Sequence, residues 1–159
     1  MFSQAHPNEV IVQEKACNAL LLLACTDGSR EVSFVASGAV AAIVGAMQAH
    51  VSDPAVQEQA CGAVAAIVRY GGAERATIVA SVSGLTAILN AIAAHPDVAG
   101  VQMQGCSALK ELTEYSGDHA ANLPELPRSQ TEPLLVAAKR KFPDECKQAV
   151  NVVLSRLSS

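Results

Sequence analysis

The sequence contains few aromatic and few charged residues. Of its 159 residues, 3% are aromatic and 16% are charged, and there is no tryptophan. Half of the residues are apolar, so alanine, valine and leucine must supply the core, which favours closely packed helices. The net charge of −4 excludes a general attraction to nucleic acid or to an acidic membrane surface. The length corresponds to one domain.

Sequence motifs of enzymes and of metal sites are also absent. There is no G-x-S-x-G, no H-E-x-x-H and no G-x-x-x-x-G-K-[ST], so we expect a protein that is not an enzyme and needs no cofactor. The five cysteines include no CxxC pair. Cys17, Cys61 and Cys106 are equivalent in a repeat described below, and stacked helices about 8–10 Å apart hold equivalent residues beyond disulfide or zinc distance. We expect buried free thiols, no metal, and a reducing, cytoplasmic location.

Two uncharged runs, 32–52 and 76–96, are each long enough to cross a bilayer. Both are interrupted by a Ser-Gly pair, contain polar side chains, and occupy the same part of successive repeats. They are therefore expected to be buried helices, with no membrane span. The first residues have neither the basic head nor the apolar stretch of a signal peptide.

One nine-residue motif recurs along the chain. It reads VQEKACNAL from Val12, VQEQACGAV from Val56 and VQMQGCSAL from Val101, and a weaker copy, CKQAVNVVL, begins at Cys146. The copies start 44, 45 and 45 residues apart. Positions 0, 4, 7, 8 and 11 of each copy are small or apolar and share one face of a helix, so they are expected to form the core. A period of this length predicts a helical solenoid.

Each full repeat is expected to contain three helices. Ser37-Gly38 and Ser83-Gly84 separate a short first helix from the second, and Gly71-Gly72 ends a third helix. In the last repeat, a proline-rich loop replaces the first helix, and the second helix is expected to begin at about Pro133. The expected helices of the full repeats are 28–36, 39–48, 56–70, 76–81, 85–94 and 101–115.

Basic residues recur near the ends of the second helices. His6, His50 and His95 lie one repeat apart, which keeps their rings from sharing a metal ion. Because the carboxyl end of a helix favours positive charge, these histidines and the run Lys139-Arg-Lys141 are interpreted as helix-end residues.

The short helix, the glycine break, the apolar second helix and the V-Q-x-x-A-C-x-A-L motif resemble the armadillo repeat. HEAT repeats are the nearest alternative, but they have two helices, and the Ser-Gly breaks favour three. The resemblance covers nearly the whole chain as a single domain. It comprises a third helix at 9–26, units at 28–70 and 72–115, and a degenerate unit at 117–159. It implies an all-α, right-handed α-solenoid whose third helices line a concave groove for a peptide or helix partner.

Family members that clamp nuclear-localisation peptides carry a tryptophan and an asparagine on each third helix. Neither residue is present at the corresponding positions, so a role as a nuclear transport adaptor is disfavoured. The tryptophan positions fall on Asn18, Gly62, Ser107 and Val152, and the asparagine positions on Leu22, Ala66, Glu111 and Arg156.

Residues about four apart on the third helices are expected to form an exposed ridge in the groove. Such a surface predicts a non-enzymatic protein–protein interaction module, although tolerated solvent-facing positions would give the same pattern. The candidate binding residues are Glu14, Asn18, Leu22, Glu58, Gly62, Ala66, Arg69, Met103, Ser107, Glu111, Val152 and Arg156.

An alternative role follows from the four consecutive leucines at 20–23. At least one of them, assigned as Leu21, must face away from the core, which suggests an end-to-end contact or self-association through the N-terminal end. In that case the chain would be a structural segment or subunit of a larger assembly.

Overall fold

The computed structural model describes residues 15–16, 19, 33–81, 83–115 and 127–158, and these residues form an all-α structure. The side chains of 33–37 and 74 are outside this description. The helices are α3 (Ser33–Ala49), α4 (Pro54–Ser81), α5 (Gly84–Ala94), α6 (Ala99–Tyr115), α7 (Arg128–Lys141) and α8 (Pro143–Leu157).

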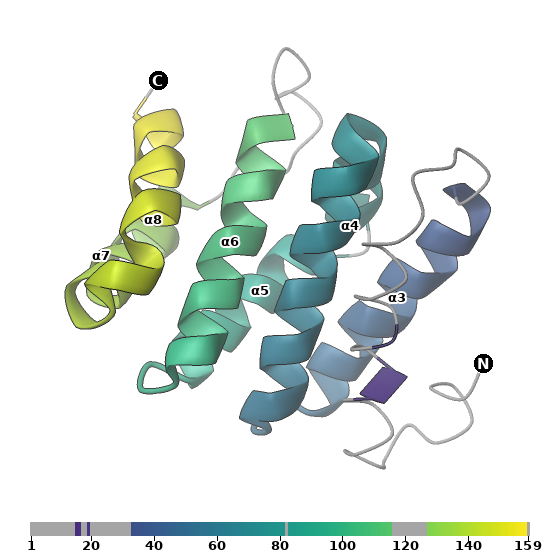
Figure 1. Cartoon of the computed structure of the whole chain (residues 1–159), viewed down its shortest axis with the longest axis horizontal. Coiled ribbons are helices and arrows are strands. Elements are labelled where there is room, and N and C mark those ends of the chain that lie inside the picture. The colour runs from purple at the N-terminus through teal and green to yellow at the C-terminus, as the bar shows by residue number, and fades with distance from the viewer. Residues whose placement is uncertain (1–14, 17–18, 20–32, 82, 116–126, 159) are drawn as a thin grey trace.

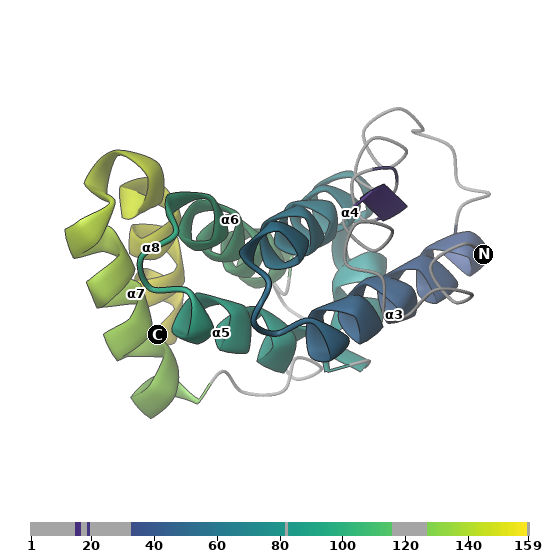
Figure 2. The same cartoon turned by 90° about the horizontal axis from the view of Figure 1, so that it is seen from below.

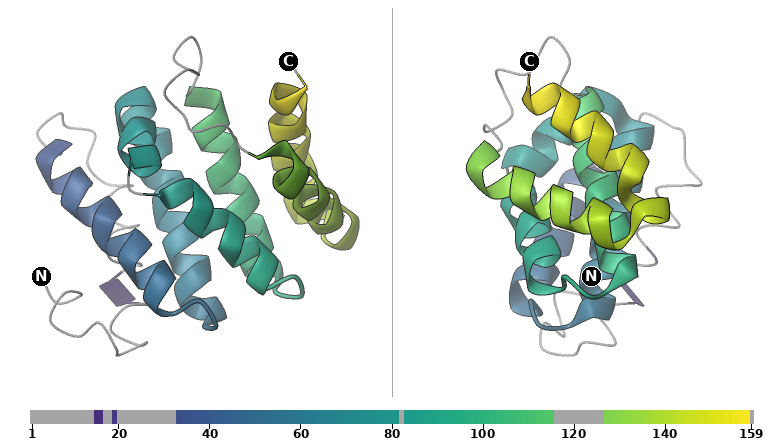
Figure 3. Two further views of the ribbon diagram at one scale, coloured as in Figure 1. Left: turned by 180° about the vertical axis from the view of Figure 1, so that it is seen from behind. Right: turned by 90° about the vertical axis from the view of Figure 1, so that its left-hand side faces the viewer.

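The helices form two layers. α4, α6 and α8 lie side by side in the layer nearest the viewer in Figure 1. α3, α5 and α7 form the second layer, which faces the viewer when the molecule is seen from behind (Figure 3). Each second-layer helix is joined by a short turn to the front-layer helix that follows it and packs against that helix. The view from below shows α4 and α6 above α3 and α5 (Figure 2). Within the front layer, α6 contacts both α4 and α8.

The repeated small and apolar positions form the core between these layers. Counted from Val56 and from Val101, positions 0, 4, 7, 8 and 11 are all buried. In α8 the first three of these positions are buried and the last two are half-buried. The predicted inward stripe is therefore confirmed in α4, α6 and α8. In the first copy Ala19 is exposed, which contradicts its assignment to the core.

Two of the three predicted glycine breaks are confirmed. α4 is kinked at Gly72, whose φ of 65° and ψ of −153° are not helical. Ser83 has a φ of 61° and separates α4 from α5. The break predicted at Ser37-Gly38 is wrong, because α3 runs through both residues. A β-carbon at Gly84 would lie 2.5 Å from Val79, whereas one at Gly38 would meet nothing within 4 Å. Tight packing accompanies the break at Ser83-Gly84 and is absent at Ser37-Gly38, where the helix continues.

The predicted start of the second helix in the last repeat is also wrong. α7 begins at Arg128, five residues before Pro133, which lies inside the helix. A proline removes the donor to the carbonyl four residues earlier, so at this position it eliminates one bond near the start of α7. The first turn forms ahead of it, since the amides of Gln130 and Thr131 both donate to the Pro127 carbonyl. The proline-rich loop was predicted over 122–133; its residues 122–126 lie outside the described part of the chain, and 128–133 form the start of α7 instead.

Candidate functional site

The glutamine of the repeated V-Q pair joins the two layers. The Gln57 side-chain amide donates to the carbonyls of Met47 (3.0 Å) and His50 (2.8 Å), near the end of α3. Gln57 is almost completely buried, as is Gln102, the glutamine of the next copy of the motif. The Gln57 amide gives the Met47 carbonyl a donor and adds a second one to the His50 carbonyl, which also accepts from the Asp53 amide.

Gln102 makes the same pair of bonds one repeat later. Its amide donates to the carbonyls of Ile92 (2.8 Å) and His95 (2.9 Å), near the end of α5. Sequence reasoning placed the valine of this motif in the core but assigned no role to the glutamine. The recurrence of a polar residue beside a buried valine in successive copies was the available signal.

Successive turns are linked to each other along one edge of the molecule. Nε2 of His95 lies 2.8 Å from the Val51 carbonyl of the preceding turn. The Lys141 ammonium pairs with the Asp97 carboxylate, again one repeat earlier. The predicted positions of His95 and Lys141 at helix ends are confirmed. Their side chains, however, bind the neighbouring turn, so these groups help to hold the repeats in register.

The predicted binding residues do not all lie on the surface. Gly62, Ala66 and Glu111 are buried, so the prediction that they line an open groove is wrong. Ser107 and Val152 are partly exposed, and Met103 and Arg156 are exposed. Four predicted residues lie outside the described part of the chain, namely Glu14, Asn18, Leu21 and Leu22.

Glu58 is half-buried and rests against the start of α6. A β-carbon built on Gly100 would lie within 3 Å of the Glu58 carboxylate, so glycine at this position leaves room for the side chain. α6 has no acidic residue of its own in its first turn. The Glu58 carboxylate therefore supplies negative charge at the positive end of that helix from the neighbouring repeat.

The exposed ridge of α6 follows a different line from the one predicted. A step of four residues advances 40° beyond a full helical turn, so repeated steps of four drift around the helix. After Ser107 this drift turns Glu111 toward α4. Lys110, which is partly exposed, and Glu114, which is exposed, continue the ridge in its place.

We use the name front face for a set of partly or fully exposed residues of the front layer, namely Glu58, Arg69, Met103, Ser107, Lys110, Glu114, Val152 and Arg156.

A charged cluster fills the space between α4 and α6 on the front face. The Arg69 guanidinium donates to one carboxylate oxygen of Glu111 at 2.9 and 3.0 Å and reaches the Ser107 hydroxyl at 3.4 Å. Lys110 lies 3.2 Å from the same Glu111 oxygen and 3.4 Å from Glu114. Glu111 is 3% exposed, so these two cations stabilise a carboxylate that has lost most of its water. The sequence placed Arg69, Ser107 and Glu111 in one groove but did not predict that they pair with one another.

The two tyrosines occupy equivalent positions at the ends of neighbouring helices. The Tyr115 hydroxyl donates to the Arg69 carbonyl at 3.1 Å, and its ring lies against Gly72. Tyr115 thus covers the kink of α4 and satisfies a carbonyl near it. Tyr70, at 54% exposure, is the most exposed of the large hydrophobic side chains in the described part of the chain.

Three of the described cysteines, Cys61, Cys106 and Cys146, are buried thiols. A hydrogen bond with Cys146, together with burial, raises the pKa of the Cys106 thiol, and the same bond lowers the pKa of Cys146. The sequence argument that equivalent cysteines cannot meet does not apply to this pair, because Cys146 begins its copy of the motif whereas Cys106 is the sixth residue of its own.

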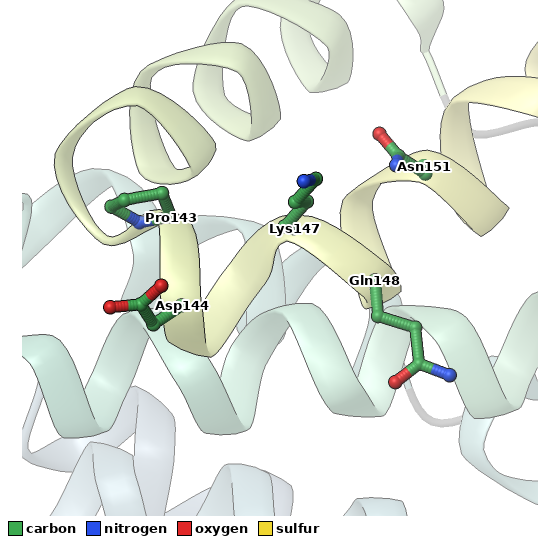
Figure 4. Close-up of a pocket in the computed structure, with 5 residues that line it drawn as sticks. All are labelled: Pro143, Asp144, Lys147, Gln148 and Asn151. Carbon is green, nitrogen blue, oxygen red and sulfur yellow. The ribbon is translucent and has the colours of Figure 1, made fainter.

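A shallow depression lies on the outer surface of the last helix pair (Figure 4). Its lining comes from α8 and consists of Pro143, Asp144, Lys147, Gln148 and Asn151. Lys139 of α7 reaches this surface and donates to Asn151 at 2.7 Å. The predicted end-to-end contact through Leu21 lies at the other end of the chain, outside the described residues.

Within the described residues, no group of three or more histidine, cysteine, aspartate or glutamate side chains is placed to hold a metal ion. No single helix in the same residues is long and apolar enough to cross a membrane. The bent pair Arg75–Ser81 and Gly84–Ala94 passes by combined length and composition alone.

Comparison with known proteins identifies no relative. No family model, no curated protein and no solved structure matches this chain.

Proposed function

We propose that the chain is a right-handed, armadillo-like α-solenoid that binds a protein or peptide partner on its front face and carries out no chemistry of its own. The observation that supports this proposal is the equivalence of successive repeats. Gln57 and Gln102 make the same two bonds in consecutive helix pairs, and the third helices lie side by side in one layer. Such a stack is rigid enough to present a fixed binding surface.

The partner is proposed to bind between α6 and α8. On the α4 side, Gly62 and Ala66 are buried and the Arg69–Glu111 pair fills the space that a peptide would need. On the α8 side, Met103 and Val152 supply exposed apolar surface. A flexible methionine adapts to apolar partner side chains, and apolar contacts rimmed by charge are typical of protein interfaces.

In this proposal Lys110 and Arg156 flank the apolar surface and select partner segments that combine apolar and acidic residues. Binding needs neither cofactor nor metal, and the buried thiols suit a reducing, cytoplasmic location. The surface therefore prefers acidic partner segments, a local preference that the net negative charge of the whole chain does not predict.

The experiment compares two charge-introducing variants in pull-downs from the source cell, with the bound proteins identified by mass spectrometry. Met103→Glu changes an exposed residue of the front face, and Asn90→Glu changes an exposed residue of α5 in the other layer. We expect the native chain and Asn90→Glu to capture the same partner and Met103→Glu to lose it. A partner lost with Asn90→Glu but retained with Met103→Glu would move the site to the second layer.

Ala66 is unsuitable for this experiment. Its side chain is 5% exposed, so Ala66→Arg would bury a charge and disturb the packing of α4. Loss of binding by that variant would report on folding, whereas a charge at exposed Met103 leaves the core intact.

A further inference from the structure

The last helix, α8, carries exposed polar residues at positions that are buried in α6. The second and sixth residues of the motif copy in α6, Gln102 and Cys106, are 2% and 0% exposed. In α8 the same positions hold Lys147 and Asn151, and both are exposed. α8 lies at one end of the front layer (Figure 1). This end of the described structure therefore has a polar surface that is buried at the equivalent positions of the preceding repeat.

Two lysines from different helices share this surface. Lys147 and Asn151 lie on one side of α8 because they are four residues apart, and Figure 4 shows them there together. The Lys139 ammonium comes from α7 and donates to the Asn151 side-chain oxygen at 2.7 Å. Gln148 is also exposed and lines the same shallow depression. We call Lys139, Lys147, Gln148 and Asn151 the outer face.

Positive charge is concentrated in this helix pair. α7 and α8 contain six of the eleven basic residues of the chain but three of its fifteen acidic residues. Lys141 is neutralised by Asp97 of the preceding repeat. In the described part of the chain no carboxylate forms an ion pair with Lys139 or Lys147, and Asp144 is the acidic residue in the lining of the depression. The outer face thus keeps positive charge that can attract a ligand.

We propose that the outer face binds a short acidic segment of a partner protein. Carboxylates of that segment pair with the ammonium groups of Lys139 and Lys147, and its backbone amides and carbonyls pair with the side chains of Gln148 and Asn151, which offer both donors and acceptors. This site goes beyond the proposed function, because it uses none of the front-face residues.

A protein segment fits the outer face better than nucleic acid or a membrane surface does. The chain outside α7 and α8 contains five basic and twelve acidic residues, so an extended polyanion that reaches past these helices meets net negative charge. A short acidic segment confines its charge to the outer face. A buried small molecule would need a deep and largely apolar pocket, whereas this depression is shallow and its lining is polar.

The test measures binding of a fluorescein-labelled peptide to the whole chain by fluorescence anisotropy. The probe is a short peptide of aspartate, glutamate and glycine, and the control peptide has asparagine and glutamine at the acidic positions. We expect the acidic peptide to bind at least about tenfold more tightly than the amide peptide, and added salt to reduce this difference.

Lys147→Glu and Arg128→Glu provide a matched pair of variants. Each reverses one exposed charge in the last helix pair, and Arg128 lies at the opposite end of α7 from Lys139. Lys147→Glu should weaken binding of the acidic peptide about tenfold, because it replaces an attraction by a repulsion, and Lys139→Glu should also weaken it. Arg128→Glu should change the affinity by less than about twofold. Circular dichroism of each variant checks that the helices are retained.

Several results would overturn the proposal. Equal affinities for the acidic and amide peptides, or equal losses for Lys147→Glu and Arg128→Glu, would show that the outer face does not select acidic segments. A loss with Arg156→Glu but not with Lys147→Glu would assign the acidic peptide to the front face, which would support the proposed function and reject this site. Tighter binding of a single-stranded oligonucleotide or of phosphatidylserine vesicles than of the acidic peptide would reject a protein segment as the ligand.

Discussion

The inner helix pairs and the last pair make their turns differently. Between α3 and α4, and again between α5 and α6, four residues separate the helices, and a buried glutamine binds two carbonyls near the end of the first helix. Between α7 and α8 only Phe142 intervenes, and exposed Lys147 stands where the glutamines stand.

The length of the turn determines whether a buried glutamine is required after it. In the longer turns the glutamine amide donates to the Met47 or Ile92 carbonyl in the last turn of the helix. It also adds a second donor to the His50 or His95 carbonyl, which accepts from the amide of Asp53 or Val98 as well. In the last turn the Phe142 amide and carbonyl bond to Ala138 and Cys146, which continues both helices through the single linking residue. A lysine in the glutamine position then remains in solvent.

Removal of a buried glutamine should change the free energy of unfolding more than any other substitution predicted below. Gln102→Met keeps a similar shape but removes the donor to the Ile92 carbonyl and leaves the His95 carbonyl with the Val98 amide alone, so we expect a loss of about 1–3 kcal/mol in the free energy of unfolding. Lys147→Met, the equivalent change in the last pair, should stay within about 0.5 kcal/mol. Urea denaturation of both variants measures the difference. Equal losses would show that the two turns do not differ energetically.

The packing of α5 on α6 gives the second prediction. A β-carbon at Gly105 would lie 2.6 Å from Ile92, whereas the equivalent residue in the last pair, Val150, is accommodated and buried. Gly105→Ala should therefore destabilise the protein by about 1–2 kcal/mol, after allowance for the better helix propensity of alanine. Gly45→Ala is the control, because nothing lies within 4 Å of its β-carbon. That change should stabilise the chain by up to about 1 kcal/mol, measured by urea denaturation. Destabilisation at both positions would mean that the close contact with Ile92 is not the cause.

Helix starts provide a third contrast. The Asp53 carboxylate accepts hydrogen bonds from the amides of Ala55 and Val56 at 3.0 and 3.1 Å, so it caps α4. α8 begins without a side-chain cap and has Asp144 in its first turn instead. Asp53→Ala should lower the unfolding free energy by about 1 kcal/mol. Asp144→Ala loses only its interaction with the helix dipole, about 0.5 kcal/mol. Thermal unfolding above pH 6 measures both, and a larger loss for Asp144→Ala would contradict the assignment.

The smallest expected effect concerns the ion pairs. The Glu111 carboxylate is buried beside Arg69, whereas the Arg128–Glu132 pair on α7 is exposed at both ends. A double-mutant cycle should give a coupling energy of about 1 kcal/mol for Arg69–Glu111, and about 0.3 kcal/mol for Arg128–Glu132. Added salt should reduce the second value more than the first. Equal coupling energies would show that burial of Glu111 does not strengthen its pair.

Much of the helical pattern could be predicted from residue spacing. The motif copies beginning at Val56 and Val101 give the α4 and α6 helices and their buried faces, because a periodic apolar stripe determines which side of a helix is buried. The kink at Gly72 and the break at Ser83 follow from local backbone preferences. Ser37-Gly38 has the same dipeptide without a break, because a Ser-Gly pair permits a break and the surrounding packing selects it.

The binding residues could be predicted less well. Met103 and Ser107 were placed on the surface correctly, but Gly62, Ala66 and Glu111 were not. A spacing rule along one helix specifies a direction from its axis. It does not specify which neighbouring helix covers that direction.

The sequence by itself determined an all-α chain with a repeated helical motif, because the period of its apolar residues is a local property. Only the tertiary structure decided that Gln102 binds the end of α5 and that Arg69 meets Glu111. Each of these contacts joins residues on different helices. The distances between these residues depend on how the helices are offset and rotated against each other. The spacing of residues within one copy of the motif does not predict that offset.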